Sequence, residues 1–100
     1  MAPHIWEDGT EGMTPDDPYV LRYWPPAIGP GATADLLRLI AAAQRQRQVR
    51  RPIHLSVLIE EGLVSGDGAR LLVRRVVPAL PGRLRRRLPG VLKRELEEGA

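Results

Sequence analysis

Prolines divide this chain into short segments, and they limit its helices more than any other feature does. A proline ring removes a backbone N–H donor and obstructs the preceding turn, so a helix accepts it readily only in the first turn. Segments with helical periodicity end at Pro25-Pro26, at Pro52, and again at Pro78 and Pro81. The sequence therefore predicts several short helices.

The clearest of these helices is predicted from Thr33 to Val49. Gly29-Pro30-Gly31 supplies a turn before it, and Thr33 is the expected N-cap. Arginines near its C-terminal end suit the negative end of the helix dipole. Its apolar residues recur on one side at helical spacing, namely Leu36, Leu39, Ile40 and Ala43.

The segment from Ile53 to Glu61 fits two structures. Its apolar residues alternate as they would in a strand. Pro52 also suits a first helical turn and Gly62 suits a helix C-cap, so a helix is favoured. The following turn, Ser65–Gly68, either closes a hairpin or caps another helix. Helical spacing of apolar residues favours that further helix, a third one, over Ala69–Leu80.

Two short helical pieces are predicted at the C-terminal end, Pro81–Leu88 and Pro89–Glu98. Each piece opens on a Pro-Gly pair, which interrupts a continuous helix. We therefore expect a bent rod there.

The first 31 residues are rich in proline and glycine and are expected to form an extended, acidic arm. One short helix is predicted within it, with Asp17 as the cap and Pro18 in the first turn. Its aromatic residues have two possible roles. They could pack the arm onto its own body, or they could anchor it on a partner, because tryptophan and tyrosine contribute much of the binding energy of protein interfaces. The hypothesis carried forward is that the arm anchors on a neighbouring protein through all four aromatic residues, Trp6, Tyr19, Tyr23 and Trp24.

Charge is distributed unevenly along the chain. Residues 1–35 carry a net charge of −5, residues 36–94 carry +11, and the remainder carries −3. Such asymmetry indicates interaction with a partner and does not specify a fold. Together with the helix predictions, it gives a mainly α fold: one small domain of three to four short helices at residues 32–98, preceded by the arm at residues 1–31.

Composition excludes several classes of protein. There is no cysteine, so disulfides, thiolate catalysis and zinc sites built on sulfur are not expected. No signal peptide and no membrane span are expected from the apolar runs, so the predicted location is the cytoplasm or a virion assembled there. Arginine outnumbers lysine fourteen to one, and Phe and Asn are absent. This pattern is typical of a GC-rich genome, such as that of an actinobacterium or one of its phages.

Catalytic groups are too sparse to predict an enzyme. The two histidines, His4 and His54, lie far apart in the sequence, and no third group orients a pair made of His54 and Ser56. The acidic pairs consist of adjacent residues, which point apart and do not form a metal site. We therefore expect no enzymatic activity, no cofactor and no metal.

A basic face is the main candidate for binding. Arginine-rich surfaces contact phosphates or acidic proteins, although a solvated helix face is the plainer interpretation. Few side chains that read base edges accompany these arginines, so backbone contact is expected in preference to sequence-specific recognition. The predicted face comprises Arg70, Arg74, Arg75, Arg83, Arg85, Arg86, Arg87, Lys93 and Arg94.

These features predict a structural or adaptor subunit of a larger assembly, from a phage or mobile element of a GC-rich host. It would dock through its arm and its basic face. Two alternatives remain open: a small basic regulator that binds nucleic acid, and a modulator that binds one host protein. A membrane-surface role is disfavoured because prolines interrupt the apolar face of the C-terminal helices.

Overall fold

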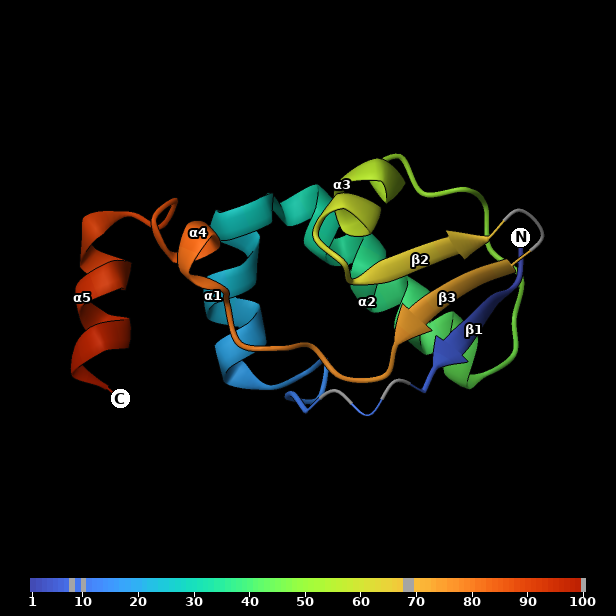
Figure 1. Cartoon of the computed structure of the whole chain (residues 1–100), viewed down its shortest axis with the longest axis horizontal. Coiled ribbons are helices and arrows are strands. Elements are labelled where there is room, and N and C mark those ends of the chain that lie inside the picture. Colours follow the sequence, from blue (N-terminus) through green and yellow to red (C-terminus); the bar gives the residue numbers. More distant parts are fainter. Residues whose placement is uncertain (8, 10, 68–69, 100) are drawn as a thin grey trace.

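The computed structural model describes residues 1–7, 9, 11–67 and 70–99. Within that part, the molecule measures 42 × 24 × 19 Å along its principal axes. Figure 1 shows the helices and strands arranged along the long axis, with the sheet toward one end and the last two helices at the other. In chain order they are β1 (Pro3–Trp6), α1 (Pro18–Ile28), α2 (Pro30–Gln44), α3 (Leu55–Glu60), β2 (Val64–Asp67), β3 (Arg70–Arg74), α4 (Gly82–Arg85) and α5 (Gly90–Glu98).

A three-stranded mixed sheet corrects the prediction of a mainly α fold. Its strand order is β1-β3-β2, with β1 parallel and β2 antiparallel to the central strand. In register, Val73 lies between Ile5 and Val64. Leu71 and Val73 are buried and alternate with more exposed residues, as expected for a strand with one covered face. The third predicted helix was therefore wrong. The predicted turn Ser65–Gly68 was placed too early, since Ser65, Gly66 and Asp67 belong to β2, and Gly68 lies outside the described residues. The antiparallel pairing of β2 with β3 agrees with the hairpin alternative.

The extended arm was also a wrong prediction. Its first residues form β1, which pairs in parallel with β3 in the C-terminal half of the chain. Met13 then forms an isolated antiparallel bridge with Val77, and α1 follows. The segment therefore belongs to the folded body.

Local signals located the helices well and their ends less well. Asp17 caps α1 as predicted, since its carboxylate accepts a hydrogen bond from the Tyr19 N–H at 2.9 Å. However, α1 continues through Pro25 and Pro26. The favoured helical interpretation of the segment after Pro52 is confirmed by α3, and the two C-terminal helical pieces are confirmed by α4 and α5.

The longest helix, α2, begins and ends earlier than predicted. Gly29, not Thr33, is its N-cap, and Pro30 occupies the first turn. The backbone of Gly29 has φ 98°, a conformation that glycine adopts without steric cost, so it can join α1 directly to α2. After Gln44, the chain leaves the helix and Gln46 adopts a φ of 56°. Arginines predicted for the last helical turn therefore lie in the loop that follows.

The core lies between α1, α2 and the sheet. Trp24 is 1% exposed, and its indole N–H donates to the Pro78 carbonyl at 3.0 Å. The Tyr19 hydroxyl accepts a hydrogen bond from the Leu80 N–H at 3.0 Å. These bonds secure the chain after β3 to α1. Leucines and valines from every layer complete the core, including Leu36, Leu39, Leu58, Leu63, Val73 and Leu84.

Candidate functional site

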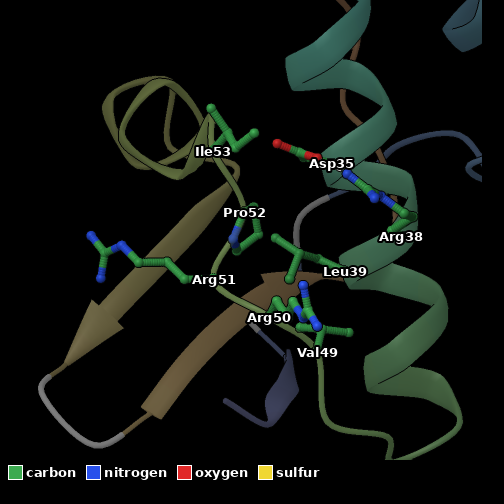
Figure 2. A pocket seen from close by; sticks show the side chains of 8 residues that line it. All are labelled: Asp35, Arg38, Leu39, Val49, Arg50, Arg51, Pro52 and Ile53. Carbon is green, nitrogen blue, oxygen red and sulfur yellow. Dashed lines mark hydrogen bonds and ion pairs between the residues drawn. The ribbon is translucent and has the colours of Figure 1, made fainter.

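A groove opens between α2 and the segment of residues 49–53, which we call the strap. Its volume is about 530 Å³. Figure 2 shows side chains from α2 facing the strap across this groove. The lining consists of Asp35, Arg38, Leu39, Val49, Arg50, Arg51, Pro52 and Ile53.

The position of the strap follows from the end of α2. Residues 35, 38 and 39 are three and four apart, so they share one face of that helix. The positive φ of Gln46 reverses the chain, and the Arg47 N–H returns to the Ala42 carbonyl at 2.9 Å. The Val49 N–H then donates to the Met1 carbonyl at 2.8 Å, which aligns the strap with the start of the chain.

The buried carboxylate of Asp35 closes the upper end of the groove. Its side chain is 4% exposed. One oxygen accepts a hydrogen bond from Arg38, and the other accepts one from the backbone N–H of His54 at 3.1 Å. Because burying a charge is costly without partners, these two bonds account for its stable position inside the fold. They also hold the strap to α2 where α3 begins.

Ile53 is the most unusual residue of the groove, since 90% of it is exposed. Single exposed apolar residues are common on protein surfaces. Here, however, Ile53 borders an apolar floor made of Leu39, Val49 and Pro52. Ile59 and Met1 are also exposed, and both line a second hollow of about 240 Å³ on the other side of the strap. Exposed apolar side chains are therefore gathered at both hollows beside the strap.

Two arginines give the strap its charge. Arg50 and Arg51 are exposed, and within the described part of the chain neither has an ion-pair partner. In Figure 2, Arg50 lies below Leu39 and Arg51 points away from α2. Arg51 lines both hollows, so positive charge is present on both sides of the strap. The groove therefore combines an apolar floor with a cationic rim.

The aromatic residues predicted to anchor a partner lie mostly inside the molecule. Tyr23 is 8% exposed and Trp24 is 1% exposed. The rings of Tyr19 and Tyr23 lie 5.0 Å apart at their centroids. Trp6 is half-buried at the end of β1, where the guanidinium of Arg74 stacks over it at 4.5 Å. In this conformation these side chains chiefly join parts of the chain to each other.

The predicted basic face does not form one surface. Figure 1 places the start of β3 and the helices α4 and α5 at opposite ends of the long axis. Arg74 also donates to the Gly62 carbonyl at 2.9 Å. Arg75 and Arg83 form ion pairs with Glu7 and Glu61. Among the described residues, contacts within the chain thus occupy three of the nine predicted residues, and the others lie at separate ends of the molecule.

The C-terminal helix is held by a group of three polar side chains. Glu95 accepts hydrogen bonds from the Arg22 guanidinium and from the Tyr23 hydroxyl, the latter at 2.6 Å. Hydrogen bonds from Arg22 and then from Tyr23 lower the pKa of Glu95 to about 2. The hydrogen bond to Glu95 raises the pKa of Tyr23 and that of Arg22. No residue of α5 is fully buried, and Leu92 and Leu96 are its partly buried contacts with the core, so this polar group adds to a shallow apolar attachment.

Acid is therefore expected to detach α5. Because the folded-state pKa of Glu95 lies below its ordinary value of 4.5, its stabilisation is complete above about pH 4.5 and is lost as the pH falls through about 2. Protection factors for amide hydrogen exchange, which correct for the intrinsic pH dependence of exchange, should fall across α5 in that window before those of α2 do. In a Glu95→Gln variant the exchange of α5 should already be fast at neutral pH, whereas Glu97→Gln should behave as the parent. Equal rates in parent and Glu95→Gln would contradict this role.

The chain matches no protein-family model, and comparison with curated proteins and with solved structures likewise finds no match. Among the described residues, no helix is long and apolar enough to cross a bilayer. The same residues contain no group of three or more His, Asp or Glu side chains placed to hold a metal ion. Function must therefore be argued from the groove and the charged surface.

Sequence reasoning missed the groove. The sequence prediction ends one helix at Val49 and begins the next element at Ile53, and it gives Arg51 no role. A signal was present, because two arginines followed by an apolar residue at a helix break place charge and apolar surface together outside a helix. This signal indicates a groove only if Leu39 and Asp35 of α2 lie across from the strap. The strap runs back along α2, and that brings the two sides together.

Proposed function

We propose that this protein is a non-enzymatic adaptor that docks an acidic protein segment in the groove between α2 and the strap. One observation supports this proposal most directly: Ile53, 90% exposed, stands at the rim of an apolar groove beside two arginines without ion-pair partners in the described part of the chain. The proposal keeps docking by a basic surface as the mode of action. It moves the docking site from the aromatic arm to the strap.

The chemistry of the lining favours a particular partner. An apolar side chain of the partner that covers Leu39, Val49 and Pro52 removes apolar surface from water, which makes the free energy of binding more favourable. A guanidinium pairs with a carboxylate through two parallel hydrogen bonds, so Arg50 and Arg51 favour aspartate or glutamate on either side of that side chain. A phosphate backbone would leave the apolar floor uncovered. A short segment with one leucine or isoleucine between acidic residues satisfies both features.

This proposal can be tested with defined peptides. Labelled peptides carrying Leu or Ile between Glu residues should bind in fluorescence anisotropy, and the same peptides with Lys in place of Glu should not. The double variant Arg50→Glu, Arg51→Glu should weaken binding by about tenfold or more, because each charge-assisted hydrogen bond contributes about 1.5 to 3 kcal/mol. Ile53→Ser should also weaken binding while leaving the thermal midpoint unchanged, since Ile53 is already exposed to water.

The matched control is Arg45→Glu with Arg47→Glu, which changes the net charge equally at two exposed residues outside the lining of the groove. It should retain acidic-peptide binding near the parental level. Equal loss in both double variants would show that only overall charge matters. No binding of any acidic peptide by the parent protein would refute the proposal.

A further inference from the structure

A second, chemically different basic surface lies at the last residue of α4 and in the turn that follows it, Arg85–Arg87, which we call the turn. Leu84 is fully buried and Leu88 is 4% exposed, and the three arginines between them are exposed. Backbone hydrogen bonds hold this turn: the Arg87 N–H donates to the Leu84 carbonyl at 3.0 Å, and the Leu88 N–H donates to the Arg85 carbonyl at 3.1 Å. Two leucines in the core thus force three consecutive guanidiniums outward from a well-held backbone.

The charge of this turn is not neutralised by its surroundings. Within the described residues, Arg85, Arg86 and Arg87 have no ion-pair partner. Two carboxylates are engaged with other arginines, since Glu61 pairs with Arg83 and Glu95 pairs with Arg22. Like charges on adjacent residues repel one another, so the turn is favourable for binding an anion that contacts several guanidiniums together.

The surface around the turn distinguishes a phosphate backbone from a protein partner. Apart from Arg83, its other exposed residues between positions 81 and 90 are prolines and glycines, so the segment presents no large apolar side chain. The nearest exposed apolar residue is Val91, on α5. Protein interfaces generally bury a desolvated apolar centre, whereas contacts with phosphates need only cations. The segment also contains no Asn or Gln to read base edges, so recognition of sequence is not expected.

We infer that the turn Arg85–Arg87 is a nucleic-acid site that contacts the phosphate backbone without sequence preference. This site is independent of the groove and lies toward the opposite end of the long axis, as Figure 1 shows for α4 and α5 relative to the chain between α2 and α3. With both sites occupied, the protein joins an acidic protein segment to nucleic acid. Either site can operate if the other does not.

The test is fluorescence anisotropy with a labelled DNA duplex of about 20 base pairs and mixed sequence, titrated from about 50 to 300 mM salt. Three phosphate contacts give an expected slope of log affinity against log salt of about −2.7. The triple variant Arg85→Glu, Arg86→Glu, Arg87→Glu should lose binding by tenfold or more, flatten that slope by about 2 or more, and retain its thermal midpoint. The triple change to lysine should restore most of the binding.

The control again is Arg45→Glu with Arg47→Glu, compared with Arg86→Glu plus Arg87→Glu so that the charge change is equal. A greater loss of DNA binding in Arg86→Glu plus Arg87→Glu than in the control supports the turn as the site. The inference is overturned if the parent protein does not bind at the lowest salt, or if the two pairs lose binding equally. Acidic-peptide binding by the triple variant, measured alongside, reports on the groove separately.

Discussion

Trp24→Ala is expected to lower the free energy of unfolding by about 3 to 5 kcal/mol, the range for loss of a large aromatic side chain from a packed core. Trp24 is 1% exposed and lies among residues from α1, α2 and the C-terminal half of the chain. Removing it leaves a cavity and also frees the Pro78 carbonyl, which accepts the indole N–H at 3.0 Å. Domains of this size are generally stable by only about 5 to 15 kcal/mol, so the variant should be marginal.

Thermal and urea unfolding would measure this loss. The expected fall in the thermal midpoint exceeds about 12 °C, from the usual shift of about 4 °C or more per kcal/mol for a domain of this size. Trp24→Phe separates the contribution of core packing from that of the indole hydrogen bond, because phenylalanine keeps most of the packing and cannot donate to the Pro78 carbonyl. Trp6→Ala is the matched control, since Trp6 is only half-buried. An equal effect of both alanine changes would show that Trp24 has no special place in the core.

Asp35→Ala is expected to lower the free energy of unfolding by about 2 to 4 kcal/mol. The buried carboxylate accepts hydrogen bonds from Arg38 and from the backbone N–H of His54. Bonds to a charged group contribute about 1.5 to 3 kcal/mol, and the His54 N–H would lose its partner in a part-buried position. Because this bond joins α2 to the start of α3, the strap should also loosen. Amide exchange at Val49 and His54 should therefore increase along with the loss of stability.

Asp35→Asn is the informative companion to this change. Its amide oxygen can keep the bond to the His54 N–H, while its NH₂ group faces the Arg38 guanidinium without accepting from it. The expected cost is therefore intermediate, with exchange at His54 less affected than in Asp35→Ala. Arg38→Gln tests the remaining contact, which is largely exposed on the arginine side. A change in stability of less than about 0.5 kcal/mol in Asp35→Ala would contradict the role assigned to the carboxylate.

Local sequence signals predicted the helices because each signal acts within a few residues. Asp17 caps the first turn of α1, and a Pro-Gly pair begins both α4 and α5, with the proline as N-cap and the glycine as first helical residue. The proline rule failed where packing was strong: Pro25 and Pro26 remain in α1, where the neighbouring Trp24 and Ala27 are buried. The free energy gained by that burial offsets the hydrogen bonds lost at the two prolines.

The candidate site was less predictable than the helices. The basic character of the molecule was evident from the charge of residues 36–94. Which arginines remain unpaired was not, because Glu7 and Glu61 are far in sequence from Arg75 and Arg83, with which they pair. The same is true of the groove, whose two sides are separated by the reversal at Gln46.

The sequence by itself determined the short helices, the uneven charge and the absence of sulfur chemistry, because these depend on residue type and on neighbours along the chain. Only the tertiary structure decided that Arg70–Arg74 forms a strand, because the apolar run Leu71-Leu72-Val73 fits two patterns. Leu72 and Val73 continue a helical stripe with Val76, whereas Leu71 and Val73 alternate as in a strand. The deciding contact comes from Pro3–Trp6, at the other end of the chain, which pairs in parallel with β3. Covering one face of that sheet with α2 and α3 stabilises the strand more than helical propensity opposes it.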